Sequence, residues 1–260
     1  AGDDEFGETV AFQIAPHGAA HGAEVFQQRL IGDLRGQGGY TDILIFDNGY
    51  FSEFGTFSIT DWIGHAPKPL LAKNFGLPES AFDSFPKEEV YFARGRIPPA
   101  EPSVPLQGWK PPAQTHKYRL LSQEPTGTFD GGREWRVDAS RFPISKTVTG
   151  VVLELDPGAL RTLHWHPNAD EWQYIVDGNV SVTLFGSHGR FRIEQLAKGD
   201  VGYIPQGYGH SIENVGSTPA RILIGLNSGT YESIDLTQWI AGNPADVLAT
   251  NFSQSAEQVA

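Results

Sequence analysis

Four residues have the types and the spacing of a metal site. His164 and His166 are separated by one residue, Glu171 follows five residues after His166, and His210 lies in a second stretch that contains glycine and proline. Three neutral imidazoles and one carboxylate are a ligand set for first-row divalent metals such as Mn, Fe, Ni, Zn or Cu. An isolated histidine usually belongs to the core or the surface, but four spaced ligands favour a metal site.

Short strands are the elements that could bring these residues together. On a strand, His164 and His166 point to one face, about 7 Å apart. Pro167-Asn168 begins a turn, after which the next strand returns Glu171 beside the pair. Short apolar segments bounded by Gly, Pro, Asn or Asp predict an all-β barrel or sandwich. The expected strands are 147–155, 172–176, 180–185, 191–195, 201–204, 211–214 and 220–226.

The glycines around the candidate ligands carry a resemblance to a known family. The first motif reads G-x5-HxH-x4-E-x6-G, from Gly158 to Gly178, and the second reads G-x5-PxG-x2-H-x3-N, from Gly199 to Asn214. Both are similar to the paired motifs of the cupin superfamily. The runs 161–174, 199–205 and 236–239 resemble the second cupin of bicupin oxalate decarboxylases, and 45–53 with 60–62 resembles the end of the first. The resemblance implies a cupin fold, a double-stranded β-helix or jelly-roll barrel, with a partial second cupin unit and short helical covers.

An internal repeat predicts how the chain is divided. Residues 59–63 and 71–75 align with 236–240 and 248–252, at an offset of 177. Upstream the offset is 179, which aligns His210 with Ile31, so the first copy has no metal site. We predict an unmatched segment over 1–30, the tail of a first cupin unit over 31–95, a proline-rich linker over 96–116 and a complete metal-binding cupin over 117–260.

The resemblance also implies a reaction. It is the cleavage of oxalate to formate and carbon dioxide, with Mn(II) as the metal and dioxygen as a further requirement. Arg161 aligns with the substrate-contacting arginine of the family, although strict alternation places it opposite the histidines unless a bend at Gly158 turns it inward. Family members often carry a glutamate at the position of Ile224, which cannot transfer a proton. Glu232 and Glu53, in the two matching loops, are the candidate acids.

Two other functions fit the same residues. The missing glutamate at Ile224 favours an oxalate oxidase or another metal-dependent oxidoreductase, because oxidation competes when protonation fails. A non-catalytic storage or metal-binding cupin is the third possibility. The missing first metal site favours this third possibility, and the complete set of four ligands opposes it.

Composition limits the partners and the location of the protein. The formal charge of −12 argues against nucleic acid and against an anionic membrane surface. There is no cysteine and no apolar run of transmembrane length. The absence of methionine predicts either a removed presequence or a sequence that begins internally, and two sequons, at Asn179 and Asn251, fit a secreted protein. The family implies a homo-oligomer, a trimer or hexamer, and a small dicarboxylate such as oxalate as the ligand.

Overall fold

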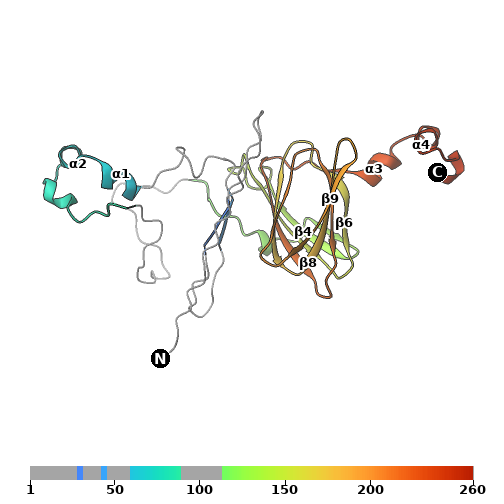
Figure 1. Cartoon of the computed structure of the whole chain (residues 1–260), viewed down its shortest axis with the longest axis horizontal. Helices are drawn as coiled ribbons and strands as arrows, with labels where there is room; N and C mark the ends of the chain where they lie inside the picture. Colours follow the sequence, from blue (N-terminus) through green and yellow to red (C-terminus); the bar gives the residue numbers. More distant parts are fainter. Residues whose placement is uncertain (1–27, 32–41, 46–58, 89–112, 260) are drawn as a thin grey trace, which may run out of the picture. The chain divides into compact units, whose positions relative to one another are not determined.

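The computed structural model describes residues 28–31, 42–45, 59–88 and 113–259 (Figure 1). The chain forms two compact units that meet between Ala113 and Gln114. Residues 1–27, Glu53 and most of the predicted linker lie outside the described residues. The predicted division of the chain into a cupin tail, a linker and a complete cupin therefore stays a proposal.

The described residues of the first unit form one pair of strands and a group of short helices. Strands β1 (Gln28–Ile31) and β2 (Asp42–Ile45) pair antiparallel. Helices α1 (Ile59–His65) and α2 (Lys68–Phe75) precede the 3-10 helix η1 (Glu79–Phe82). The ring of Phe82 packs against the rings of Phe75 and Phe85, with centroids 5.8 Å and 5.6 Å away. This aromatic contact stabilises the helical segment by burying Phe82, which is 6% exposed.

The second unit repeats the helical segment after a β-barrel. Helix α3 spans Leu236–Ala241, α4 spans Ala245–Phe252, and the short α5 spans Ala256–Val259. Both ends of α4 lie 177 residues after the corresponding ends of α2. The repeat seen in the sequence is therefore also a repeat of helices. None of the helices in the described part of the chain combines the length and the apolar character that crossing a bilayer requires.

Two antiparallel sheets face each other in the second unit and form the barrel (Figure 1). The six-stranded sheet has the order β10-β7-β12-β5-β4-β3, and the five-stranded sheet has the order β13-β6-β11-β8-β9. The first sheet contains β3 (Gly127–Phe129), β4 (Gly132–Val137), β5 (Thr149–Leu155), β7 (Glu171–Asp177), β10 (Val201–Ile204) and β12 (Ala220–Leu226). The second contains β6 (Leu160–Trp165), β8 (Asn179–Gly186), β9 (Arg190–Ala197), β11 (Gly209–Asn214) and β13 (Ile234–Asp235), and the 3-10 helix η2 (Leu120–Ser122) precedes β3.

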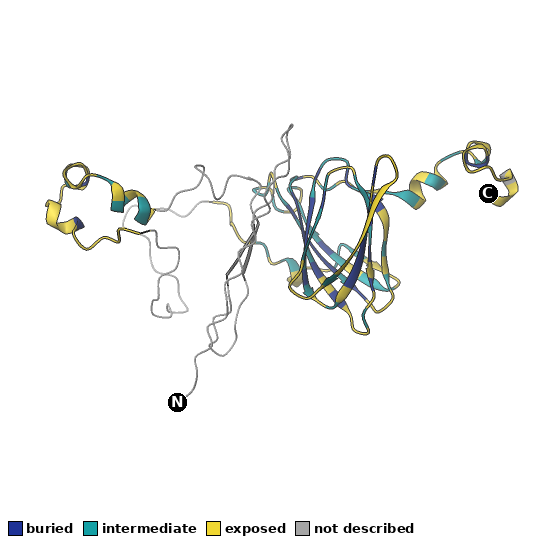
Figure 2. Cartoon of the chain, in the orientation of Figure 1, coloured by how far each residue is buried: buried dark blue, intermediate teal, exposed yellow. Residues whose placement is uncertain are grey.

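The core lies between the two sheets, where apolar side chains from both inner faces meet (Figure 2). Ile175, Val180, Ile212 and Ile222 are fully buried there. Burial of each such side chain contributes about 1.5–3 kcal/mol to folding. The alternation of inner and outer residues along each strand thus fixes which side chains reach the interior, including those of the metal site.

Four motif glycines make the turns that the strands require. Gly158, Gly178, Gly199 and Gly207 have φ angles between 76° and 94°, in the left-handed region that favours glycine. Gly178 joins β7 to β8, and a Cβ atom there would lie only 2.7 Å from the Cα atom of Ala220. These conformational needs explain why the glycines frame the candidate ligands.

The predicted all-β cupin fold is confirmed, and all seven expected strands are present. The sequence analysis missed β3 and β4, which form a hairpin around Asp130 and Gly131. The positive φ of Gly131, 88°, and the alternation of Glu134-Trp135-Arg136 were the available signals. Strand β4 contributes directly to the cavity described below.

Candidate metal centre

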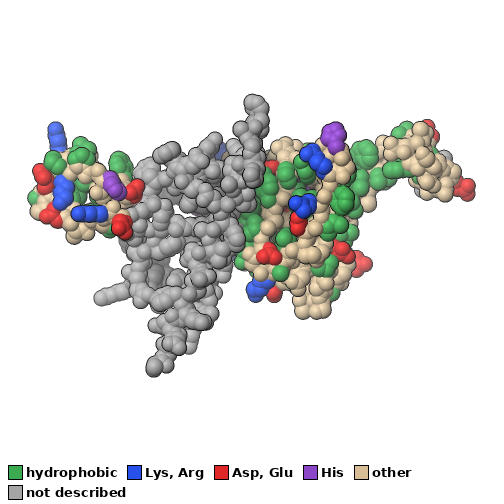
Figure 3. Space-filling view, in the orientation of Figure 1, with side chains coloured by type: hydrophobic (Ala, Val, Ile, Leu, Met, Phe, Trp, Pro, Cys, Tyr) green, Lys and Arg blue, Asp and Glu red, His purple; other side chains and the backbone are tan. Residues whose placement is uncertain are grey.

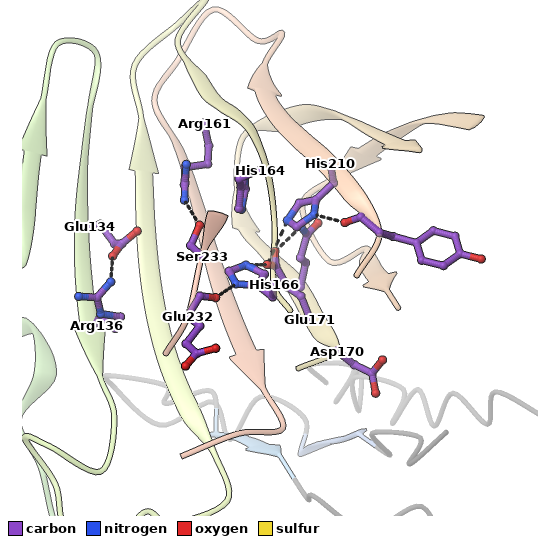
Figure 4. Close-up of polar contacts among 12 residues, drawn as sticks. Glu134, Arg136, Arg161, His164, His166, Asp170, Glu171, His210, Glu232 and Ser233 are labelled. Carbon is purple, nitrogen blue, oxygen red and sulfur yellow. Dashed lines mark hydrogen bonds and ion pairs between the residues drawn. The ribbon is translucent and has the colours of Figure 1, made fainter. Parts of the chain in front are cut away.

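The four predicted ligands come together in the structure (Figure 4). His164 lies near the end of β6, His166 just after it, Glu171 at the start of β7, and His210 in β11. One ligand atom from each lies within 4.8 Å of the others, and each residue is only 2–3% exposed. Pairing of β11 with β6 sets His210 directly opposite His164.

Backbone carbonyl groups hold all three imidazoles in one orientation. The Nδ1 atom of His164 contacts the carbonyl oxygen of Thr162 at 2.7 Å, that of His166 contacts Glu232 at 2.6 Å, and that of His210 contacts Tyr208 at 3.1 Å. A carbonyl oxygen only accepts, so each Nδ1 donates and each Nε2 is left as the ligand atom. Metal-binding histidines typically donate such a hydrogen bond from the ring nitrogen that does not bind the metal.

A buried glutamine holds the carboxylate. Gln173 Nε2 donates to Glu171 Oε1 at 2.7 Å, while Glu171 Oε2 lies 2.9 Å from His166 Nε2 and 3.2 Å from His210 Nε2. Gln173 is fully buried, and Gly202 on β10 leaves room for it, because a Cβ atom there would lie 2.9 Å from Gln173 Oε1. Glu171 therefore presents one oxygen to the imidazoles.

The electrostatics of the cluster keep the carboxylate ionised. Burial alone acts to raise the pKa of Glu171, but His210 and His166 outweigh it and hold that pKa well below its usual value. Burial acts to lower the pKa of His210, yet the Glu171 carboxylate raises it. Burial, His210 and Arg161 together lower the pKa of His164 to about 2. The Glu171 carboxylate is therefore ionised while it lies beside the three imidazoles.

This donor set fits a first-row divalent ion. The Nε2 atoms and one carboxylate oxygen converge, the carboxylate is ionised, and every Nδ1 has a carbonyl partner. Four protein ligands leave about two positions of an octahedral ion for other molecules. The same four residues satisfy several metals, so the donor set by itself does not select one.

A β-bulge turns Arg161 toward the site. In the pairing of β6 with β11, His164 faces His210 and Arg161 faces Ile212, so one extra residue lies in β6 between these two pairs. Ile212 points into the core, and Arg161 therefore points inward as well. The expected bend at Gly158 is the wrong cause: the change of face occurs at residues 162–163.

Arg161 is held by two residues at the end of the barrel. Its guanidinium donates to Asp235 Oδ1 at 2.8 Å and to Ser233 Oγ at 3.2 Å. Burial acts to lower the pKa of Arg161, but Asp235 and Tyr231 raise it, so it stays charged. A guanidinium has five N–H donors, and these two contacts leave others for a ligand.

Arg161 and three of the ligands line a small cavity. Its volume is about 10 Å3, the space of about one water molecule. Most of its other walls are apolar, so a charged group inside it is poorly screened by solvent. The cavity is lined by Glu134, Val151, Leu153, Arg161, His164, His166, Glu171, Ile212, Ile224, Leu226 and Tyr231.

Asp170 holds the loop that carries His166 and Glu171. Its Oδ1 accepts from the backbone N–H of Gln206 at 2.8 Å, and its Oδ2 accepts from Asn227 Nδ2 at 2.8 Å. Asn227 Oδ1 in turn accepts from the backbone N–H of Asp170 at 2.8 Å. This reciprocal pair fixes the turn between β6 and β7, and with it the spacing of two ligands.

The structure describes one of the two candidate acids, Glu232. Glu53 lies outside the described residues. Glu232 is exposed, contacts His166 through its carbonyl oxygen, and in Figure 4 its carboxylate points away from the four ligands. That Glu232 supplies a proton stays a prediction, but its side chain is not one of those that line the cavity.

Sequence reasoning missed several residues of the site. Gln173 follows Glu171 on the same strand face, so its alternation was an available signal. Tyr231, whose ring centroid lies 5.5 Å from that of His166, and Glu134 on β4 had no signal in the ligand motifs. They come from elements far along the chain that only the fold brings together.

Comparison with known proteins places this geometry in a family. The cupin family model matches residues 118–260. An oxalate decarboxylase of Bacillus subtilis is 38% identical over 205 residues, which cover 78% of this chain and 52% of that protein. A solved structure of that oxalate decarboxylase, described for its Mn(II) centres, has a TM-score of 0.74 at 35% identity and covers 85% of this chain and 59% of the other. A formate complex of Lactobacillus farciminis oxalate decarboxylase gives a TM-score of 0.75 at 33% identity, covering 85% and 65%.

The chain belongs to the cupin family. It is homologous to bicupin oxalate decarboxylases, and the family match lies in residues 118–260. The chain spans about half the length of the curated relatives it matches.

Proposed function

We propose that the protein is an oxalate decarboxylase-like metalloenzyme that converts oxalate to formate and carbon dioxide. The observation that carries this proposal is the cavity in which Arg161 lies beside His164, His166 and Glu171. Manganese is the proposed metal, since a relative of known structure is described by its Mn(II) centres. Dioxygen is proposed as a further requirement on the resemblance alone.

The residues of the cavity have separable roles in this proposal. A bound divalent ion would supply positive charge and open positions for one carboxylate of the substrate. Arg161 offers further N–H donors to a carboxylate, in a planar geometry that suits it. The apolar side chains of Ile212, Ile224 and Leu226 keep water from the reacting carbon. Oxalate is larger than the cavity, so binding requires the cavity to widen.

A second candidate, an oxalate oxidase, is favoured by Ile224. This residue lines the cavity, is 5% exposed and cannot donate a proton. Oxidation needs no proton on carbon: oxalate gives two molecules of carbon dioxide, and its two electrons, with two protons, reduce dioxygen to hydrogen peroxide. The two candidates share the metal and the substrate and differ in the product.

Product analysis tests both candidates at once. Manganese-loaded protein is incubated with oxalate at mildly acidic pH, and oxalate, formate and peroxide are measured together. Formate in step with oxalate loss supports the decarboxylase, and peroxide without formate supports the oxidase. Metal bound at one ion per chain without loss of oxalate rejects both and leaves a metal-holding cupin. His166→Gln is the control, because it removes one ligand.

We also propose that the chain associates with copies of itself as a trimer or hexamer. A groove of about 760 Å3 on the outer face of the five-stranded sheet is lined in part by Leu163, Phe185 and Phe191. These side chains are 49%, 57% and 68% exposed, and clustered exposed apolar side chains are typical of interaction surfaces. Figure 3 shows hydrophobic side chains between charged ones on the visible side of the barrel. Sedimentation of wild type and of Phe191→Glu measures this association, and a monomeric wild type would contradict it.

Secretion is the remaining proposal. It is supported by the two sequons. The first residues of both sequons, Asn179 and Asn251, are exposed, as glycan attachment requires. Detection of the protein and its glycans in the culture medium of the source cells would support it, and retention of the protein inside the cells would contradict it.

A further inference from the structure

Strand β4 places two charged side chains inside the barrel. Pairing with β5 sets Glu134 opposite Leu153 and Arg136 opposite Val151, and both partners belong to the buried core. Directly paired residues of antiparallel strands point to the same face. The side chains of Glu134 and Arg136 are only 12% and 30% exposed. In Figure 4 this pair lies to the left of the four ligands, with Arg161 and Ser233 drawn between them.

The orientation of β4 is fixed from its other face. Trp135 lies between the two charged residues, points outward, and is 8% exposed beneath the segment that precedes β3. Its Nε1 donates to the carbonyl oxygen of Gln123 at 3.1 Å. The carbonyl oxygen of Glu134 accepts from the backbone N–H of Thr126 at 2.7 Å. The side chain of Glu134 therefore points into the interior of the barrel.

The cost of this arrangement argues for a role beyond stability. Replacing a buried ion pair by well-packed apolar residues often leaves stability unchanged or increases it. The Glu134 carboxylate and the Arg136 guanidinium are 3.5 Å apart, long for a charge-assisted hydrogen bond. Arg136 is also drawn to Tyr231, with its guanidinium carbon 4.0 Å from the ring centroid. The Glu134 carboxylate thus lies near the positive charge of Arg136 without forming a short hydrogen bond to it.

Glu134 is the acid that shares the cavity with the metal ligands. Among the described side chains that line the cavity, the carboxylates are Glu171, which faces the imidazoles, and Glu134. The other charged or titratable groups there are Arg161, Tyr231 and the histidines, while β5 and β12 contribute only apolar side chains. A carboxylate ligand that enters this space comes near the Glu134 carboxyl group, and two nearby carboxylates cannot both stay ionised at low cost.

We propose that Glu134 takes up a proton when oxalate binds and delivers it to the carbon that becomes formate. The inference rests on the proposed decarboxylase function. The carbon–carbon bond breaks, carbon dioxide leaves, and the electron pair stays on the other carbon. The proton of the Glu134 carboxyl group forms the new C–H bond, and solvent returns a proton to Glu134. No net oxidant is consumed. This step fills the role that Ile224 cannot perform, and it uses a carboxyl group that lines the cavity, which Glu232 does not.

Calorimetry without dioxygen tests the proton uptake apart from turnover. Oxalate is titrated into manganese-loaded protein in two buffers of different ionisation enthalpy, which gives the protons bound per oxalate. Wild type takes up about one more proton than Glu134→Gln near pH 6. Glu213→Gln, an exposed residue on the outer face of β11, is the matched control and behaves as wild type. Equal uptake in wild type and Glu134→Gln overturns the inference.

The rate of formate release provides the second test. Formate release by Glu134→Gln falls about 100-fold or more with unchanged manganese content, as loss of a general acid predicts. Glu134→Asp, which keeps the acid, retains more activity than the glutamine variant and guards against a folding defect. Loss of formate in Glu232→Gln with full activity in Glu134→Gln assigns the acid to Glu232 and overturns the inference. A wild type that consumes no oxalate rejects the proposed function, and the calorimetry still decides whether Glu134 faces a bound carboxylate.

Discussion

Replacing Gln173 by leucine tests whether the outer residues of the metal centre set its affinity. The change keeps a side chain of similar size in a fully buried position but removes the 2.7 Å hydrogen bond to Glu171 Oε1. Gln173 Oε1 has no hydrogen-bond partner, so its removal leaves no donor group unpaired. Glu171 then lacks the hydrogen bond that orients its other oxygen, Oε2, toward the imidazoles. Part of the free energy of metal binding must then be used to orient the carboxylate.

The expected size of the effect follows from the charge on Glu171. A hydrogen bond to a charged group is worth about 1.5–3 kcal/mol. If metal binding must supply that energy, the Kd for Mn(II) rises about 10- to 100-fold. Free Mn(II) is measured by electron paramagnetic resonance during a titration of wild type and variant.

The matched control for this variant is Gln195→Leu. Gln195 donates to Ser181 Oγ at 2.9 Å on the outer face of the five-stranded sheet, away from the ligands. Its substitution leaves the Kd unchanged. An equal Kd in wild type and Gln173→Leu, with the protein folded, would refute the view that Gln173 prepares Glu171 for the metal.

Three further changes probe other parts of the site. In metal-free protein the folded pKa of His164, about 2, lies below its unfolded value, so His164 binds a proton only in the unfolded state as the pH falls from 6.5 to 5. This lowers the free energy of unfolding by up to about 1.4 kcal/mol per pH unit, and the raised pKa of His210 offsets part of the fall near pH 6.5. Equal urea unfolding at pH 6.5 and pH 5 would contradict this. Asn214→Ala removes the hydrogen bonds that Asn214 Nδ2 donates to the carbonyl oxygens of Leu155 and Thr218, at 2.9 Å and 2.8 Å. The free energy of unfolding measured by denaturant titration falls by about 3 kcal/mol, and the metal content does not change. A loss below about 0.5 kcal/mol would count against this expectation. Arg161→Lys raises the KM for oxalate on the order of tenfold in steady-state assays with manganese content unchanged, and an unaltered KM would show that Arg161 does not contact the substrate.

The ligand set was predictable because it is a local pattern on strands. His164, His166 and Glu171 need only a strand, a turn and a second strand, and these follow from alternation and from Pro167-Asn168. The glycines of the motifs were equally readable, since their positive φ angles demand that residue type. Local sequence signals of this kind also gave the seven predicted strands.

The rest of the site depends on pairings between distant strands. The inward turn of Arg161 comes from a bulge in β6 that appears only when β6 pairs with β11. Glu134 reaches the cavity because β4 extends the six-stranded sheet next to β5. Nothing in the sequence around Glu134 distinguishes it from a surface glutamate. Its position is a property of the sheet order.

Carbon-13 magnetic resonance of labelled oxalate tests the central claim most directly. Manganese-loaded protein is incubated aerobically with the labelled substrate at mildly acidic pH, alongside the His166→Gln variant. The account predicts one formate and one carbon dioxide for each oxalate lost, with no conversion by the variant. Unchanged oxalate in the presence of protein that holds one manganese per chain would contradict it.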